Sequence, residues 1–245
     1  MRTTKIEWTE RTWNPVTGCT KLSEGCVHCY AEVMSRRLYA MGNAKYTNGF
    51  KSTIHHDALK EPLGWKKPSI IFVCSMSDLF HKDVPFEFID EVFKVIEGTP
   101  QHTYQILTKR AERMAEYFET RNIPQNAWVG VTVECKQTKA RIDCIRNLNA
   151  CVKFLSCEPL LEDLGNLCLQ GINWIIVGGE SGAQARPMKE EWVLNIKRQA
   201  EANNIPFFFK QWGTWSKDGV RGNKKVNGKL LQGKIVQNMP DINRQ

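Results

Sequence analysis

The stretch TYQILTKRAERMAEYFETRNIPQNAWVGVTV (residues 103–133) decides the fold class. It starts with a short run of β-branched and aromatic residues, continues with helical spacing, and ends in a second apolar run. A strand, a helix and a strand in this order form one βα unit of a parallel sheet. Both runs are apolar on both faces, as expected of strands that are covered on each side. The stretch therefore predicts a buried parallel sheet.

The same alternation continues on both sides of this stretch. Strands are predicted at residues 69–75, 103–108, 127–133, 152–160, 172–181 and 205–213, with one more short strand before Cys19. Helices are predicted at residues 86–97, 109–121, 135–148 and 189–204. This pattern fits a doubly wound sheet and a TIM-type barrel equally. In both folds, chemistry takes place at the carboxyl ends of the strands.

Two segments do not follow the alternation. Residues 42–68 lack a clear period and are predicted to be a long excursion between the first helix and the next strand. Residues 214–245 alternate glycine and lysine with short apolar pieces, which indicates a hairpin-like basic extension. We therefore expect a βα domain over residues 1–213 and a C-terminal extension over residues 214–245.

The charge and the cysteine content of the sequence indicate which kinds of partner and which cellular compartment to expect. Lys and Arg total 34 against 26 Asp and Glu, a formal net charge of +8, which suits a polyanionic partner and plain solubility about equally. Residues 1–13 lack the apolar core of a secretory signal, and no run of 18 apolar residues predicts a membrane span. Nine cysteines, an odd number without a signal, indicate reduced thiols. We expect a cytoplasmic protein without a membrane partner.

Three of the cysteines lie close together in GCTKLSEGCVHCYAE (residues 18–32), at Cys19, Cys26 and Cys29. Thiolates bind soft metals and iron–sulfur clusters. A structural zinc site takes four ligands, so zinc here would need His55, His56 or a distant cysteine. Three local cysteines suit a four-iron cluster that leaves one iron open. Inert thiols are a third interpretation.

The ending CVHCY, followed by serial βα units, resembles the radical S-adenosylmethionine superfamily. Its C-x2-C-Y pattern is similar to that of spore photoproduct lyase. The segment WTERTWNPVTGCTKLSEGCVHCYAE (residues 8–32), with KQWG (residues 210–213), resembles a phage- and prophage-associated family of unknown function. The usual superfamily spacing is C-x3-C-x2-C, whereas this chain has C-x6-C-x2-C. The resemblance implies a partial or near-complete parallel (βα)6–8 barrel of the TIM type, with a short basic appendage.

The resemblance also implies the cofactors. Cys19, Cys26 and Cys29 would bind a [4Fe–4S] cluster whose open iron takes S-adenosylmethionine. An electron donor of the flavodoxin or ferredoxin type would reduce the cluster, and a 5′-deoxyadenosyl radical would then take a hydrogen atom from the substrate. In such enzymes the cofactors perform the difficult chemistry, and the protein binds them and excludes water.

Further site residues follow from the same resemblance. The cofactor-binding candidates are His28, Tyr30, Ser75, Ser77, Asp78, Thr132, Glu134, Gly178, Gly179 and Glu180. Most stand at the predicted carboxyl ends of strands. An alternative role for Asp78 is to cap a helix or turn. An alternative role for Gly178 and Gly179 is to form a tight connection between a strand and a helix. The catalytic candidates are Cys157 and Lys210, although a buried cysteine is usually inert.

The expected substrate is a nucleotide or a nucleic-acid base. Bases in the C-terminal extension stand near Trp212 and Trp215, and bases mixed with aromatic residues suit a nucleic-acid backbone with stacked bases. A solvated appendage explains the same composition. One alternative keeps the enzyme class and changes the substrate to a peptide or small metabolite. Another is a zinc-stabilised nucleic-acid-binding protein without catalysis.

Overall fold

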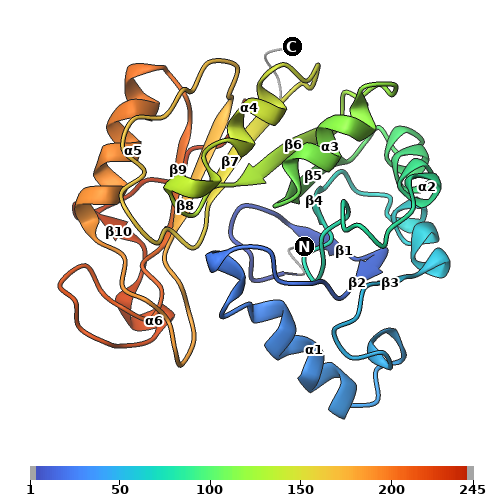
Figure 1. Cartoon of the computed structure of the whole chain (residues 1–245), viewed down its shortest axis with the longest axis horizontal. Coiled ribbons are helices and arrows are strands. Elements are labelled where there is room, and N and C mark those ends of the chain that lie inside the picture. The colour runs from blue at the N-terminus through green and yellow to red at the C-terminus, as the bar shows by residue number, and fades with distance from the viewer. Residues whose placement is uncertain (1–3, 242–245) are drawn as a thin grey trace. The chain divides into compact units, whose positions relative to one another are not determined.

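The computed structural model describes residues 4–241 (Figure 1). The chain forms two compact units, and each unit is assembled from separate segments. The first unit contains Met1–Leu22, Cys29–Gly130 and Leu148–Cys151. The second contains Ser23–His28, Val131–Asn147 and Val152–Gln245. Residues 1–3 of the expected βα domain and 242–245 of the expected extension lie outside the described residues, and the predicted boundary after residue 213 stays a prediction.

The main sheet has seven strands in the order β1-β4-β5-β6-β7-β8-β9. They are β1 (Arg11–Trp13), β4 (Ile70–Val73), β5 (Thr103–Thr108), β6 (Ala127–Thr132), β7 (Lys153–Cys157), β8 (Trp174–Gly178) and β9 (Phe207–Gln211). In the first unit β4 pairs in parallel with β1 and β5, and in the second β8 pairs in parallel with β7 and β9. The predicted α/β class and its parallel strands are confirmed, and the radical S-adenosylmethionine type of barrel stays a prediction.

Helices follow β4, β5, β6 and β8 as predicted, and the described residues also form helices near the N-terminus and near the C-terminus. The helices are α1 (Tyr30–Ala40), α2 (Phe86–Glu97), α3 (Ala111–Phe118), α4 (Arg141–Arg146), α5 (Glu190–Ala202) and α6 (Lys224–Asn227). The helix expected over residues 135–148 is divided into a 3-10 turn, Lys136–Thr138, and α4. Thr138 Oγ1 accepts hydrogen bonds from the N–H groups of Glu134 and Cys135, which closes a turn before α4 begins.

Residues 42–68 have no regular hydrophobic period because they form a series of short elements. They contain the 3-10 turns Ala44–Tyr46, His56–Lys60 and Pro62–Gly64 and the strand β3 (Thr53–Ile54). β3 pairs antiparallel with β2 (Val16–Thr17), which directly precedes Gly18 and Cys19. This excursion therefore supports the start of the cysteine segment in the first unit.

The core of each unit comes from the apolar faces that the sequence predicts. In the first unit, α2 buries Phe88, Ile89, Val92, Phe93 and Ile96, and Phe93 stacks on Tyr117 with ring centroids 5.6 Å apart. In the second unit, all five residues of β8 are buried. Each large apolar side chain that is fully buried stabilises the fold by about 1.5–3 kcal/mol. Among residues 4–241, no helix has the length and apolar character needed to cross a bilayer.

The C-terminal residues of the described chain pack along β9 in the second unit. Phe208 and Gln237 form an antiparallel bridge, and the Phe209 N–H donates to the Val236 carbonyl (2.7 Å). Trp174 Nε1 donates to the carbonyl of Asn238 (2.9 Å). The short hairpin of β10 (Leu230–Leu231) and β11 (Lys234–Ile235) precedes this contact. A short hairpin therefore lies in these residues and the segment after it pairs with the edge strand β9, whereas a basic appendage stays a prediction.

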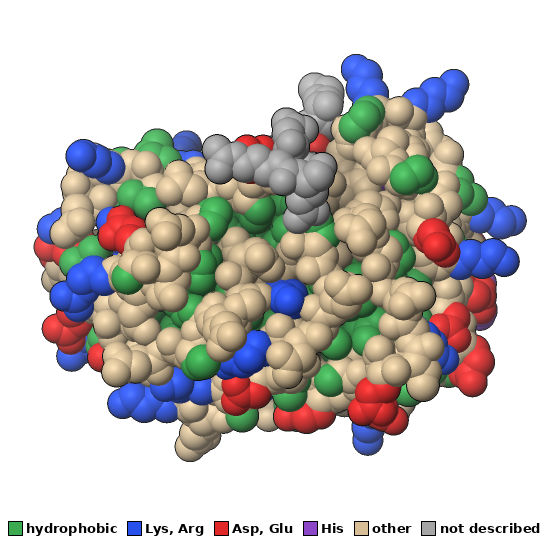
Figure 2. Space-filling model, turned by 90° about the horizontal axis from the view of Figure 1, so that it is seen from above, with side chains coloured by type: hydrophobic (Ala, Val, Ile, Leu, Met, Phe, Trp, Pro, Cys, Tyr) green, Lys and Arg blue, Asp and Glu red, His purple; other side chains and the backbone are tan. Residues whose placement is uncertain are grey.

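Charged side chains of both signs are mixed on the surface. On the face that Figure 2 shows, Lys and Arg side chains lie among Asp and Glu side chains and do not form one continuous patch. The positive excess of the sequence is therefore spread out on this face.

Candidate functional site

The three cysteines of residues 19–29 occupy three different local structures. Cys19 follows β2, Cys26 ends the 3-10 turn Glu24–Cys26, and Cys29 is the N-cap of α1. All three are half-buried thiols, whereas Cys74 and Cys157 are buried in the cores of their units. Gly18 has a φ of +75°, and a Cβ there would lie 2.2 Å from the Lys51 carbonyl oxygen. Only glycine therefore allows this entry into the cysteine segment.

The donor set fits an iron–sulfur cluster by its chemistry, because thiolates are the usual ligands of such clusters. Cys19 and Cys29 belong to the first unit and Cys26 to the second. Within residues 4–241, no three Cys, His, Asp or Glu side chains stand together as a metal-binding group. The fit therefore rests on the kind of ligand and on the sequence spacing.

The two histidines considered as zinc ligands have other partners in the first unit. His55 Nε2 lies 2.8 Å from Thr17 Oγ1, and Thr17 Oγ1 donates to the Lys45 carbonyl (3.1 Å). His55 Nε2 therefore carries the hydrogen of its contact with Thr17. His56 Nδ1 lies 3.3 Å from Glu91 Oε2. Each of these contacts uses one ring nitrogen, so the other nitrogen of each histidine stays available to a metal, and a zinc site completed by either histidine stays an alternative.

Asp78 pairs with Arg110 at the ends of β4 and β5. Asp78 Oδ2 accepts from Arg110 Nη1 (2.9 Å) and from the Lys109 N–H (3.1 Å). Its other oxygen accepts from Thr108 Oγ1 (2.7 Å) and from the Phe80 N–H (3.0 Å). The sequence suggested a cap or a cofactor contact for Asp78. Its four hydrogen bonds in the structure make it the anchor of Arg110, and the cofactor contact stays a prediction.

The predicted cofactor residues near the end of β4 also bond within the first unit. Ser75 Oγ donates to Asn14 Oδ1 (3.1 Å), and Ser77 Oγ donates to the Val16 carbonyl (2.7 Å). The hydroxyl of Tyr30 donates to the Ser75 carbonyl. Asn14 Oδ1 also accepts from the Met76 N–H (3.1 Å), so this residue orders the turn after β4. Sequence reasoning did not single out Asn14, which carries no motif of its own.

In the second unit, three acids near the strand ends are each paired with a base. Glu134 Oε2 accepts from Arg141 Nη1 (2.8 Å), and the same nitrogen donates to the Thr132 carbonyl (2.8 Å). Glu158 Oε1 lies 2.9 Å from Lys210 Nζ. The third acid, Glu180, pairs with Arg186. The sequence analysis singled out Glu134, Glu180 and Lys210 and missed both arginines.

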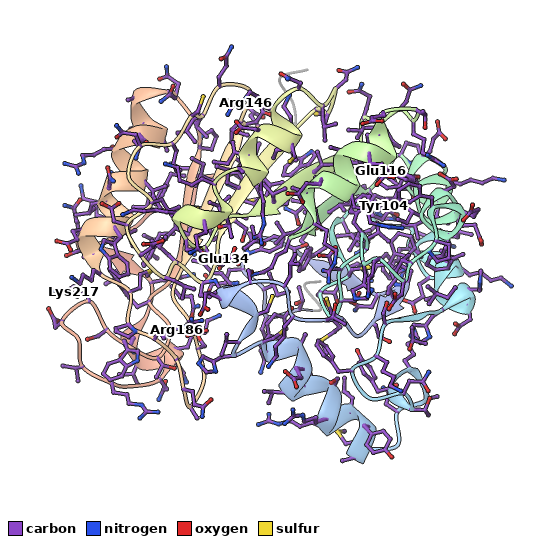
Figure 3. The ribbon with its side chains drawn as sticks, in the orientation of Figure 1. Tyr104, Glu116, Glu134, Arg146, Arg186 and Lys217 are labelled. Carbon is purple, nitrogen blue, oxygen red and sulfur yellow. The ribbon has the colours of Figure 1, made fainter. Side chains whose placement is uncertain are left out.

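Arg186 also holds the segment that carries Cys26 and His28 (Figure 3). Its Nε donates to Glu180 Oε2 (3.0 Å), and its Nη2 donates to Glu180 Oε1 (2.8 Å). Nη2 also donates to the Glu24 carbonyl (2.9 Å). Ser23 Oγ donates to Glu134 Oε1 nearby in the same unit. Residues 23–28 are thus attached to the second unit through two buried glutamates.

The two predicted cofactor glycines make close approaches to the protein itself. A Cβ on Gly178 would lie 2.7 Å from Glu158 Oε1, and a Cβ on Gly179 would lie 1.9 Å from the Trp212 carbonyl oxygen. The sequence predicted close approach to a ligand at these positions. In the structure these close approaches are made by the Glu158 side chain and the Trp212 backbone, and contact of either glycine with a ligand stays a prediction.

Cys157 lies fully buried at the end of β7. Burial raises the pKa of its thiol, and the negative charges of Glu158 and Glu134 raise it further. The sulfur therefore keeps its hydrogen at neutral pH. This is the protonation state that a hydrogen donor needs, and it is equally the state of an inert core thiol.

Arg186→Gln is expected to lower the free energy of unfolding at pH 7 by about 1.5–3 kcal/mol, because Glu180 loses charge-assisted hydrogen bonds. Burial alone would raise the pKa of Glu180, but hydrogen bonds from Arg186 hold it below its usual value. A lowered carboxyl pKa stabilises the fold above the unfolded pKa, about 4.3, and this contribution disappears as pH falls through the folded pKa.

Urea unfolding between pH 3 and pH 7 measures this effect. The wild-type chain should lose stability below about pH 4.3, and the variant should lose less. Lys189→Gln is the control, because the exposed Lys189 ammonium lies 3.6 Å from Glu191 and 5.6 Å from the centroid of the Trp192 ring. Such surface pairs contribute about 0–1 kcal/mol. Equal pH profiles for the wild type and Arg186→Gln would contradict the role of Arg186.

Comparison with known proteins gives one match. The model of a family described as a protein of unknown function (DUF5131) matches residues 3–240. The matched span includes both compact units and all three cysteines of residues 19–29. No curated protein and no solved structure matches the chain.

Proposed function

The chain belongs to the DUF5131 family of unknown function, and we propose that it is a radical S-adenosylmethionine enzyme that binds a [4Fe–4S] cluster. The observation that carries the proposal is the set of three half-buried thiols, Cys19, Cys26 and Cys29, within residues 19–29. No fourth cysteine lies in this segment. Three ligands leave one iron of such a cluster open.

The protein's own part in this chemistry is binding and positioning. When bound, the cluster and S-adenosylmethionine supply an electron and the precursor of a radical. In the first unit, Tyr30, Ser75, Ser77 and Asp78 would line the cofactor. The second unit would contribute His28, Thr132, Glu134, Gly178, Gly179 and Glu180. Cys157 keeps a hydrogen on its sulfur, and Lys210 would bind the substrate while Glu158 fixes its ammonium group.

The proposed substrate is a nucleotide or a nucleic-acid base, and basic and aromatic residues of the second unit support this choice. The C-terminal residues carry the bases Lys217, Arg221, Lys224, Lys225, Lys229 and Lys234. The Arg221 guanidinium lies over the Trp215 ring, 5.9 Å from its centroid. Base-rich segments with aromatic residues bind nucleic-acid backbones and stack on bases.

The double variant Lys225→Gln/Lys234→Gln should weaken binding to single-stranded DNA, because both lysines are exposed. Each lost phosphate contact reduces the slope of log affinity against log salt by about 0.7. Fluorescence anisotropy at several salt concentrations measures affinity and slope together. Lys66→Gln/Lys67→Gln removes the same charge from exposed positions of the first unit and should change neither. Equal effects of the two double variants would reject the C-terminal binding surface.

Charge substitution tests this surface better than truncation does. Residues 236–238 pair with β9, so deleting residues 214–245 would expose the edge of that strand. Lower affinity of the truncated chain would then report loss of fold as well as loss of charge.

Anaerobic reconstitution with iron and sulfide tests the enzyme class. Iron and acid-labile sulfide are quantified, and electron paramagnetic resonance of the reduced protein is recorded with and without S-adenosylmethionine. A four-iron signal that changes on adding the cofactor supports the proposal. Stoichiometric zinc without a cluster would instead favour a zinc-stabilised nucleic-acid-binding protein. A cluster with no affinity for nucleotides or nucleic acid would favour a peptide or small-metabolite substrate.

A further inference from the structure

We propose that Arg110 is a positioning residue for Cys19, which it prepares as a metal ligand through a charged hydrogen bond to the sulfur. The inference rests on the ligand role of Cys19 in the proposed function. Arg110 Nη1 lies 3.6 Å from Cys19 Sγ, and both residues belong to the first unit. In the thiol form, Cys19 Sγ can donate to the Thr20 carbonyl (3.4 Å) while it accepts from Arg110.

The guanidinium of Arg110 is held in one orientation. Nη1 donates to Asp78 Oδ2 (2.9 Å), and Nη2 donates to both the carbonyl and the hydroxyl oxygen of Thr20 (3.1 Å each). The Arg110 and Asp78 side chains are only 12% and 8% exposed. A charged hydrogen bond is stronger in such a site than in water. Arg110 therefore approaches the sulfur in a fixed geometry.

A second contact holds the Thr20 side chain, beside Cys19. His81 Nδ1 accepts from the Asp83 N–H (3.2 Å), so the hydrogen of the neutral ring is on Nε2. His81 Nε2 lies 2.8 Å from Thr20 Oγ1, the same oxygen that Arg110 contacts. Thr20 therefore has hydrogen-bonding contacts with both Arg110 and His81. These contacts restrict the position of Cys19, its neighbour in the chain.

Charge balance gives the expected consequence for metal binding. Three thiolates carry three negative charges, and a divalent cation supplies two positive charges. The bound complex is therefore negative overall, and a guanidinium beside one sulfur stabilises it. Outer-shell partners of metal ligands typically change metal affinity by about 10–100-fold when they are removed.

Co²⁺ titration of the full-length, metal-free protein under anaerobic conditions tests this inference directly. Thiolate-to-cobalt charge-transfer absorbance reports the ligands without cluster assembly. We expect Arg110→Gln to weaken Co²⁺ binding by about 10–100-fold, and Arg110→Lys to weaken it less because the charge remains. Lys82→Gln is the matched control: it removes one exposed positive charge next to His81 and should leave the affinity unchanged.

A further variant separates the loss of the Arg110 contact from a loss of the fold. Arg110→Gln leaves the buried Asp78 carboxylate without its cation, so Asp78→Asn/Arg110→Gln removes both charges. The double variant should fold and show the same loss of Co²⁺ affinity. Affinity equal to that of the wild type would overturn the inference, and so would a wild-type chain that gives no thiolate–cobalt band. If Co²⁺ binds as expected but iron and sulfide assemble no cluster, the proposed enzyme class fails and the role of Arg110 stands.

Discussion

Cys26→Ala is expected to leave the reconstituted protein with background levels of iron and acid-labile sulfide while the chain keeps its fold. A cluster bound by three cysteines loses a third of its protein ligands in this variant. The fold should persist because residues 23–28 are attached through Ser23 and Glu24, whose partners are Glu134 and Arg186. The contact between the Cys26 sulfur and Ser23 Oγ is long, at 3.9 Å.

Cys168→Ala provides the matched control for this experiment. Cys168 is an exposed thiol of the second unit for which neither sequence nor structure indicates a function. Its removal should leave iron content and the thermal midpoint unchanged. Full iron content in the Cys26→Ala variant would refute the assignment of Cys26 as a ligand. Iron loss in both variants would indicate that iron binds thiols without selection.

Gly179→Ala is expected to destabilise the fold by about 3 kcal/mol or more, or to prevent folding. The added Cβ would lie 1.9 Å from the carbonyl oxygen of Trp212 and 2.8 Å from its carbonyl carbon. Both are backbone atoms, so no side chain can rotate away. The Gly179 N–H also donates to the Gln211 carbonyl (3.0 Å), and separating the two segments would break this hydrogen bond.

Urea denaturation of Gly179→Ala and of Gly64→Ala measures this prediction. A Cβ on Gly64 meets no atom within 4 Å, so this control should change the free energy of unfolding by less than about 0.5 kcal/mol. Wild-type stability of Gly179→Ala would show that the segment after β8 can shift, and the position would then be available to a ligand.

The sequence predicted the elements well because their signals are local. The strand at 103–108 and the helix at 86–97 have the predicted bounds, and the other long elements differ by a few residues at their ends. Alternation of β-branched runs with a helical period needs only neighbouring residues. The break between Thr138 and Arg141 was missed, because the Thr138 hydrogen bonds that close the turn have no strong sequence signal.

The site was predicted less completely because its contacts join distant residues. Arg110 meets Asp78 and Cys19, which lie 32 and 91 positions away. Arg186 meets Glu24 across 162 positions. No periodic pattern encodes such pairs. The glycines at the end of β8 were recognised as candidate positions, but the sequence could not show that the Glu158 side chain and the Trp212 backbone approach them.

The discontinuous make-up of the two units has a consequence for the order of events during synthesis. Residues 23–28 belong to the second unit, yet the next segment of that unit begins only at Val131. A ribosome adds roughly 5–20 residues per second, so about a hundred intervening residues take on the order of 5–20 s. Throughout this interval the partners of Glu24 and Ser23, which are Arg186 and Glu134, have not yet been synthesised. The segment that carries Cys26 therefore reaches its final place late, and we expect a metal to enter the finished chain and not the nascent one.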